Sequence, residues 1–201
     1  MSGPAMPAPV SPLAGVLLPT VAGAAADAAL VLVDASLQPR YGCKGPGAMA
    51  WLAEQGLPLP AAPNQWLALS SGGRILRLGR SEFLIESDAA RIAALYAAPR
   101  APAVYPVLRQ DACMVLHGPG LPALLRQTCN INFAALDLAL APVVLTSMVG
   151  VSVTVLPERT DSGEIGYRLW CDGSFGPYLW RTLWAIAGEL GGGALGHEAV
   201  L

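Results

Sequence analysis

Charged side chains are scarce in this sequence. Asp, Glu, Lys and Arg together make up 13% of its 201 residues, and the mean hydropathy is +0.49. An average soluble domain has about 25% charged residues, so few charges are left here to cover an isolated surface. The composition therefore indicates either an integral membrane protein or a subunit that buries part of its surface against partners.

Uninterrupted apolar runs of membrane-spanning length are also lacking. Residues 138–157 carry no charge and are long enough to cross a bilayer, yet Pro142 and Gly150 interrupt them. Residues 151–155 alternate Val with Ser or Thr, which is the period of a strand with one apolar face. We expect no membrane span and favour burial against a partner.

Clusters of Lys and Arg are absent, and the formal net charge is −2 with a pI near 5.6. The largest basic groupings are pairs such as Arg74 with Arg77. Nucleic acid binding depends on clustered positive charge, so the sequence argues against nucleic acid as a partner.

Closely spaced metal ligands are missing as well. The four cysteines contain no C-x-x-C pair and have no pair of histidines nearby: Cys43, Cys113, Cys129 and Cys171. A zinc site needs such spacing, so no metal site is predicted. Each cysteine lies among apolar residues and is interpreted as a buried thiol in a reducing compartment.

The first 29 residues are rich in Ala, Pro and Gly and contain no Lys or Arg. A secretory signal begins with basic residues before its apolar run. We therefore expect a cytoplasmic location and interpret residues 1–28 as a flexible or partner-draped arm.

What the sequence does contain is a repeated order of short elements. Gly-Pro-Gly turns at 45–47 and 118–120 are each followed by a helix, strands and a helix. Strands are predicted at 29–34, 64–69, 74–79, 82–86, 112–116, 143–146, 151–156 and 166–171, and helices at 48–55, 89–97, 121–127 and 177–190. This order predicts an α+β protein with a first half at 29–98, a Pro-rich linker at 99–110, a second half at 111–190 and a Gly-rich tail at 191–201.

The predicted helix at 177–190 is strongly apolar. It carries a stripe at helical spacing, and Trp180 and Trp184 broaden that stripe: Leu179, Leu183, Ile186 and Leu190. Only Arg181 and Glu189 are charged within it. We expect this helix to be packed on both sides.

Candidate catalytic residues are few. His117, near Asp111 in sequence, could act as a general base, but the chain has no G-x-S-x-G elbow or other matched nucleophile. Glu82 and Glu86 flank apolar strand residues, and a solvated loop is predicted for Glu158, Asp161 and Glu164. No pair of carboxylates with separate acid and base roles is evident.

Candidate binding motifs have structural explanations. The Gly-Pro-Gly turns could hold an anion at a helix start, but each proline removes one N–H donor. Gly191, Gly193 and Gly196 match a dinucleotide fingerprint in letters, yet they follow a helix instead of opening one. Five tryptophans are interpreted as core or interface anchors, with a ligand pocket as the alternative: Trp51, Trp66, Trp170, Trp180 and Trp184.

Three groups of residues resemble the gamma subunit of heterotetrameric sarcosine oxidase. They are residues 44–48 with Trp51 and Leu52, then Asn64 with residues 76–84, and finally residues 172–180. The resemblance covers about residues 29–190 and consists of packing and turn residues. It implies a fold related to the folate-binding region of glycine-cleavage aminomethyltransferases and to YgfZ-type folate-binding proteins, with two ferredoxin-like halves.

The resemblance also implies a division of labour. FAD, FMN, NAD and tetrahydrofolate would belong to partner subunits (alpha, beta and delta), and this chain would hold no cofactor and no catalytic, cofactor-binding or metal residue. The chain departs from the relatives in two places. It lacks the Lys-Gly-Cys-x-x-Gly-Gln type motif of the YgfZ group, and residues 130–133 are uncharged where relatives tend to carry an acidic residue.

Three hypotheses follow. The first is a non-catalytic structural subunit of a sarcosine oxidase-type flavoenzyme, with no active site of its own. The second is a stand-alone folate-binding protein or one-carbon transferase, which would need a deep pocket with an acidic residue such as Glu82 or Glu86. The third is a subunit of a related N-methyl amino-acid dehydrogenase, which the residues do not distinguish from the first.

Overall fold

The computed structural model describes residues 10–16, 28–70, 72–159 and 163–197. It contains two sheets, and the larger has six strands. Their order is β11 (Gly193–His197), β1 (Val31–Asp34), β7 (Ala112–His117), β10 (Ile165–Cys171), β9 (Val151–Arg159) and β8 (Val144–Met148). The β1–β11 pair is parallel and the other pairs are antiparallel.

The second sheet has five strands, all antiparallel. Their order is β3 (Gln65–Ala68), β4 (Arg74–Arg77), β5 (Glu82–Glu86), β2 (Arg40–Lys44) and β6 (Tyr105–Val107). Four α-helices accompany the sheets: α1 (Ala48–Glu54), α2 (Ala89–Ala97), α3 (Leu121–Thr128) and α4 (Gly176–Glu189). Short 3-10 turns lie at Phe133–Ala135, Leu138–Leu140 and Gly173–Phe175.

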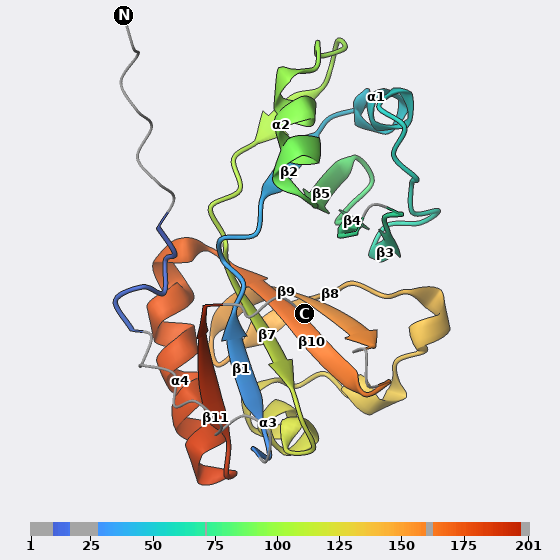
Figure 1. Ribbon diagram of the computed structural model, residues 1–201. Helices are drawn as coiled ribbons and strands as arrows, with labels where there is room; N and C mark the ends of the chain where they lie inside the picture. Colours follow the sequence, from blue (N-terminus) through green and yellow to red (C-terminus); the bar gives the residue numbers. More distant parts are fainter. Residues whose placement is uncertain (1–9, 17–27, 71, 160–162, 198–201) are drawn as a thin grey trace, which may run out of the picture.

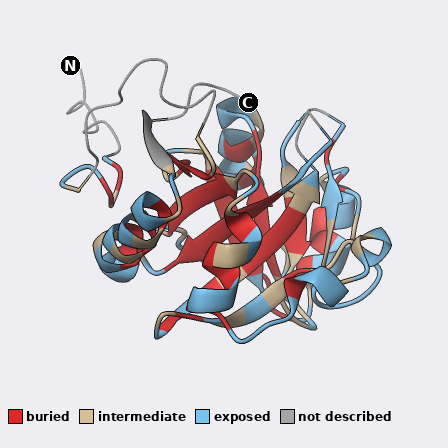
Figure 2. Cartoon of the chain, turned by 90° about the horizontal axis from the view of Figure 1, so that it is seen from below, coloured by how far each residue is buried: buried red, intermediate tan, exposed pale blue. Residues whose placement is uncertain are grey.

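The elements form four layers. In Figure 1, α1 and α2 lie beside the five-stranded sheet in the upper part, and α3 and α4 lie against the six-stranded sheet below. One core cluster, including Leu169 and Trp180, fills the space between the six-stranded sheet and its helices. A second, including Trp51 and Phe83, lies under α1 and α2. A third, including Leu84 and Trp170, lies between the two sheets, so the buried residues run through the centre of the molecule (Figure 2).

Local sequence explains most of these elements. Asp88 caps α2 by accepting a hydrogen bond from the backbone N–H of Arg91. In β9, Val151 and Val153 are buried against the helical layer while Ser152 is exposed, as the alternation predicts. The mixed fold of helices and sheets is confirmed, and the described chain has no helix of the length and hydropathy that a bilayer crossing requires. The ferredoxin-like character of the halves stays a prediction.

Sheet membership differs from the predicted division of the chain. Strand β1 comes from the predicted first half but pairs with β7 of the second. Strand β6 lies inside the predicted linker and pairs with β2. Residues 40–44, which belong to none of the predicted strands, are strand β2. These pairings are long-range, so local turn signals did not reveal them.

Both predicted terminal segments contain ordered parts. In the predicted arm, Leu13 has no exposed surface and belongs to the core beneath α4, and Ser11 donates a hydrogen bond of 2.6 Å to Asp34. In the predicted tail, residues 193–197 form β11 beside β1. Residues 1–9 and 17–27 of the predicted arm and residues 198–201 of the predicted tail lie outside the described residues.

Helix α4 follows its prediction in extent and differs in packing. Its buried residues are on one face: Gly176, Leu179, Trp180, Leu183 and Ala187. Tyr178 on the other side is 54% exposed. The helix was predicted to pack on both sides, but no element of the described chain buries this other side.

Candidate functional site

The carboxylate of Glu86, at the end of β5, is the centre of a buried charge network. Its side chain is 2% exposed. Arg40 Nε lies 2.9 Å from Glu86 Oε2, Arg168 donates to Oε1 across 3.1 Å, and Arg74 forms a third ion pair with Oε1. The indole N–H of Trp170 also donates to Oε2, at 3.3 Å. Glu86 therefore accepts from both sheets at once.

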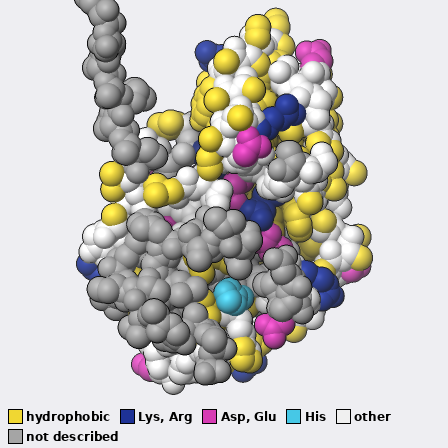
Figure 3. All heavy atoms as spheres, in the orientation of Figure 1, with side chains coloured by type: hydrophobic (Ala, Val, Ile, Leu, Met, Phe, Trp, Pro, Cys, Tyr) yellow, Lys and Arg dark blue, Asp and Glu magenta, His cyan; other side chains and the backbone are white. Residues whose placement is uncertain are grey.

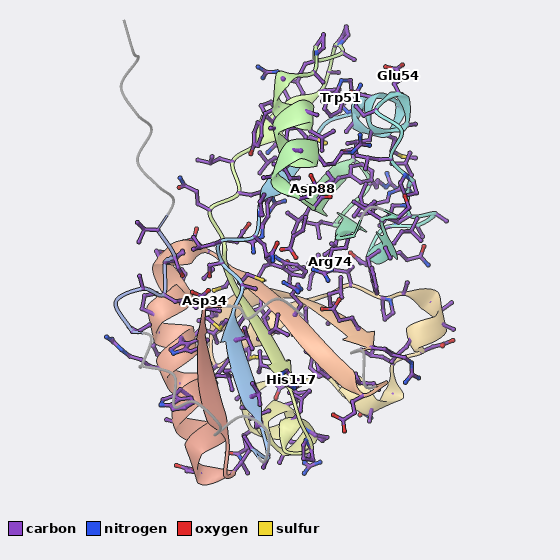
Figure 4. The ribbon with its side chains drawn as sticks, in the orientation of Figure 1. Asp34, Trp51, Glu54, Arg74, Asp88 and His117 are labelled. Atoms are coloured by element: carbon purple, nitrogen blue, oxygen red, sulfur yellow. The ribbon has the colours of Figure 1, made fainter. Side chains whose placement is uncertain are left out.

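Strand register brings these groups together. Arg40 and Arg74 are the cross-strand neighbours of Glu86 on β2 and β4. Arg168 and Trp170 come from β10 of the facing sheet. In Figure 4, Arg74 lies at the junction of the two sheets. The network ties the two sheets together where the third core cluster ends.

Burial and the arginines act oppositely on Glu86. Burial alone would raise its pKa, but the guanidinium groups of Arg168, Arg40 and Arg74 outweigh it and hold the pKa below the ordinary value. Burial would likewise lower the pKa of Arg168, yet Glu86 keeps it raised. A carboxylate held ionised by several donors is a poor general base. The arrangement therefore suits a structural role for Glu86.

Glu158 is the second acid of the network and corrects a prediction. It accepts hydrogen bonds from Arg74 at 2.9 Å and Arg168 at 3.3 Å. It belongs to β9, not to the predicted solvated loop; Asp161 lies outside the described residues. The guanidinium of Arg40 also donates hydrogen bonds to the backbone carbonyls of Ala35, Ser36 and Asp111. These bonds stabilise its buried positive charge.

A cavity of about 370 Å³ opens beside this network. It lies against the face of the six-stranded sheet that is turned toward β5. Its lining residues are Leu84, Arg109, Asp111, Leu145, Thr146, Ser152, Val153, Thr154, Trp170, Cys171 and Asp172. Ligand pockets commonly measure about 300–1,000 Å³, so this one is at the small end.

Asp111 is the least satisfied acid along the cavity. Its Oδ2 atom is buried and has no hydrogen-bond partner among the described residues. The nearest charged partner of its Oδ1 atom is Arg109 at 3.9 Å, and Arg109 is already held at 3.0 Å by Glu82. Burial raises the pKa of Asp111, and the nearby carboxylate of Asp172 raises it further, while Arg109 and Arg40 oppose the shift. A hydrogen-bond donor or a cation placed in the cavity would relieve this carboxylate.

His117 is far from these acids. Asp111 precedes β7 and His117 ends it, and a strand of this length spans roughly 20 Å. Figure 4 shows His117 at the end of the sheet remote from Arg74. Burial lowers the pKa of His117, against the opposing charge of Glu164. The structure therefore does not bring His117 and Asp111 together as a catalytic pair.

The Gly-Pro-Gly turns use their donors within the chain. Gly47 N–H donates to the carbonyl of Ala103 at 3.2 Å, and Gly120 N–H donates to that of Ala29 at 2.6 Å. Gly45 and Gly118 share the same φ of 118°. The two turns are equivalent in conformation, and a phosphate at either would have to displace an internal hydrogen bond.

The cysteines and tryptophans are mostly core residues. All four cysteines are free and buried, and burial raises the pKa of Cys43 and Cys113 to about 12. The side chain of Trp51 is 1% exposed, and its indole donates to the carbonyl of Pro99. Of the five tryptophans, Trp170 lines the cavity. No group of His, Cys, Asp and Glu in the described chain is arranged to hold a metal ion.

The sequence analysis gave no role to Arg40 or Arg168, and it considered Asp111 only as a neighbour of His117. A usable signal existed for Arg168, because a charged residue inside the apolar run 165–171 requires a buried partner. For Asp111, only the meeting of β7, β9 and β10 at the cavity reveals its position.

Comparison with known proteins places the fold in a recognised class. The fold is similar to that of a chain of a heterotetrameric sarcosine oxidase and to that of a glycine cleavage aminomethyltransferase, as the motif resemblance predicted. No family model matches the sequence, and no curated protein matches it.

Two solved structures have a fold similar to that of this chain. One is heterotetrameric sarcosine oxidase from Corynebacterium sp. U-96 in complex with pyrrole 2-carboxylate. Its matched chain has a TM-score of 0.70 and 22% identity, over 93% of this chain and 98% of that one. The other is glycine cleavage system aminomethyltransferase T from Bartonella henselae, with a TM-score of 0.59 and 16% identity over 85% of this chain. This chain spans 48% of that enzyme's length.

Proposed function

We propose that the chain is a non-catalytic structural subunit, of gamma type, in a cytoplasmic sarcosine oxidase-type complex. Such a complex demethylates sarcosine oxidatively to glycine, passes the one-carbon unit to tetrahydrofolate or releases it as formaldehyde, and forms hydrogen peroxide. FAD, FMN, NAD and tetrahydrofolate would be held by alpha, beta and delta partners. The observation that carries the proposal is the fold match over nearly the full length of both chains.

The character of the interior supports a structural role. The buried acid Glu86 is engaged by three arginines and an indole, and burial raises the pKa of the Cys43 and Cys113 thiols. Neither group is free to act as a base or a nucleophile at neutral pH.

The surface supports a role as a subunit. Large apolar side chains are at least half exposed at Tyr96, Tyr105, Leu108, Leu140, Leu145, Phe175 and Tyr178. In Figure 3, hydrophobic side chains gather in the upper part of the face, over the five-stranded sheet and its helices, with charged groups between them. Such side chains favour burial against another chain.

The alternative proposal is a folate-binding or aminomethyltransferase-like one-carbon protein. The cavity and the unsatisfied carboxylate of Asp111 favour it, because a pterin offers N–H donors to an acid. The acids first considered fit less well: Glu86 is enclosed by arginines, and Glu82 is paired with Arg109.

The mass of the native particle tests the proposal. The chain is purified gently from its natural source, and light scattering is recorded together with flavin absorbance. We expect a yellow complex far heavier than 20.7 kDa whose other subunits are identified from their peptides. A colourless particle of 20.7 kDa would contradict the proposal.

Calorimetric titration with tetrahydrofolate tests the alternative. The subunit proposal predicts no micromolar binding by the isolated chain. Micromolar binding that is lost in Asp111→Asn and kept in Glu54→Gln, an exposed acid on α1, would instead support a folate-binding protein.

A further inference from the structure

Strands β8 and β9 are partly exposed on the face of the six-stranded sheet that is turned toward the five-stranded sheet. Leu145 and Thr154 are cross-strand neighbours, as are Ser147 and Ser152, so these four side chains share one face. Leu145 is 51% exposed, and Ser147 and Ser152 are exposed. The core between the sheets reaches Leu156 and Trp170 but not Leu145. Part of this sheet face is therefore uncovered within the described chain.

Strand β8 is also an outer strand. The sheet order ends with it, and beyond it Cys129 forms an isolated bridge to Met148. An exposed leucine on the last strand of a sheet is an unfavourable surface for an isolated chain. It becomes favourable when another polypeptide covers it.

The inner end of this uncovered face is acidic. Asp111 and Asp172 both line the cavity, and Asp172 is close enough to raise the pKa of Asp111. Arg109 also lines the cavity, but its close ion pair is with Glu82, which is not a lining residue. The cavity thus combines an unpartnered carboxylate oxygen of Asp111 with an apolar rim at Leu145.

We propose that this cavity is a docking site for a partner subunit, which inserts an Arg or Lys side chain toward Asp111 and covers Leu145 with an apolar residue. The inference rests on the proposed function and adds to it the surface and the chemistry of the contact. A basic side chain matches the charge of Asp111 and Asp172, and its methylene stem matches the apolar wall.

The position of the cavity favours a polypeptide over a small molecule. Small-molecule sites enclose most of the ligand surface and are predominantly apolar. Here one wall is an outer strand with a half-exposed leucine, and the hydroxylic residues Ser152 and Thr154 on the same sheet face are part of the lining. These features resemble the rim of a protein interface.

Reconstitution with the partners tests the site. The probe is the set of subunits identified in the native complex, mixed with variants of the full chain, and dissociation constants are measured by mass photometry or sedimentation. Asp111→Asn should weaken assembly about tenfold or more, and Leu145→Arg should weaken it further than Leu145→Glu, because a cation at the rim repels a basic occupant. Glu54→Gln serves as the control and should assemble normally.

Thermal unfolding of the isolated variants separates docking from folding. Asp111 Oδ2 has no partner in the described chain, so Asp111→Asn should unfold at the same temperature as the parent or higher. Assembly unchanged by Asp111→Asn and Leu145→Arg overturns the docking site while the subunit proposal stands. Loss of a co-purified small molecule from Asp111→Asn, with assembly intact, also overturns it. A chain that remains a monomer with every subunit present rejects both proposals.

Discussion

At the scale of single residues, Glu86 shows how much one side chain can hold together. It accepts from arginines on β2, β4 and β10, three strands from two sheets. Removing one member of a buried ion network leaves the others as unpaired buried charges, which costs more than the intact network contributes. The stability of the sheet junction therefore depends on this carboxylate.

Glu86→Gln should lower the free energy of unfolding by about 3–5 kcal/mol, because Arg40 and Arg168 stay buried without their counter-charge. Urea unfolding followed by tryptophan fluorescence measures the loss. Glu82→Gln on the same strand is the matched control: the Glu82 side chain is 42% exposed, so about 1 kcal/mol or less is expected. Equal losses in the two variants would show that the network is not the cause.

The pH dependence of this loss is a second prediction. The folded-state pKa of Glu86 lies below its ordinary value of 4.5, so its contribution is complete above that value and declines as the pH falls toward the folded-state pKa. The stability difference between the parent and Glu86→Gln should be constant near neutral pH and shrink below about pH 4.5. Urea unfolding of both proteins across this range gives the difference, and a difference that grows on acidification would contradict the assignment.

At the scale of elements, part of the predicted N-terminal arm packs against the core. Leu13 has no exposed surface, and Pro12 lies near Gly173 and Gly176 at the start of α4. The backbone N–H of Leu13 donates to Ser11 Oγ, which in turn donates to Asp34. A short stretch of the predicted arm thus closes the helical side of the larger core.

Leu13→Ala should destabilise the protein by about 2–5 kcal/mol, because the cavity it leaves lies in the core under α4. Chemical denaturation with a two-state fit measures the change. Val10→Ala, at a side chain that is 75% exposed, should cost no more than about 0.5 kcal/mol. A loss of that size for Leu13→Ala would mean that residues 10–16 do not hold to the core.

The first Gly-Pro-Gly turn allows a test of the close backbone packing at Gly45. At Gly45 φ is 118°, and an added Cβ would overlap the carbonyl oxygen of Ala103. Gly45→Ala should cost at least about 3 kcal/mol, since strain and steric overlap combine. Gly56 has φ of 73° with nothing near its Cβ position, so Gly56→Ala should cost only about 1–2 kcal/mol. Thermal unfolding compares the two, and similar losses would rule out the close approach.

At the scale of the whole molecule, the two sheets depend on each other. Strand β1 belongs to the six-stranded sheet although β2 follows it into the other sheet, and the third core cluster draws residues from both. The chain therefore crosses between the sheets instead of completing one before starting the next.

We expect the full chain to unfold in a single transition and a fragment of residues 99–201 to show none. In the fragment, β7 lacks its neighbour β1 and Arg168 lacks Glu86. Circular dichroism and tryptophan fluorescence during urea unfolding should coincide for the full chain. A cooperative transition in the fragment would contradict this interdependence.

Sequence by itself determined the short-range features. Helices α1, α2, α3 and α4 and strand β5 are predicted within one residue of their ends, because caps, turn glycines and side-chain periodicity act over a few positions. The scarcity of charge is read directly from the composition, and the helices after the Gly-Pro-Gly turns are predicted from neighbouring residues. The resemblance to sarcosine oxidase was readable for the same reason, since its motifs are turn and packing residues.

Only the tertiary structure decided which strands meet. The pairing of β1 with β7 and β11, the placing of Arg40 beside Glu86, and the exposure of Asp111 to a cavity all join residues distant in sequence. Such contacts depend on strand register and on the packing of one sheet against another, and neither leaves a periodic signal in the chain. Packing thus decided that Glu86 is enclosed by arginines and that Asp111 keeps a carboxylate oxygen without a hydrogen-bond partner in the described chain.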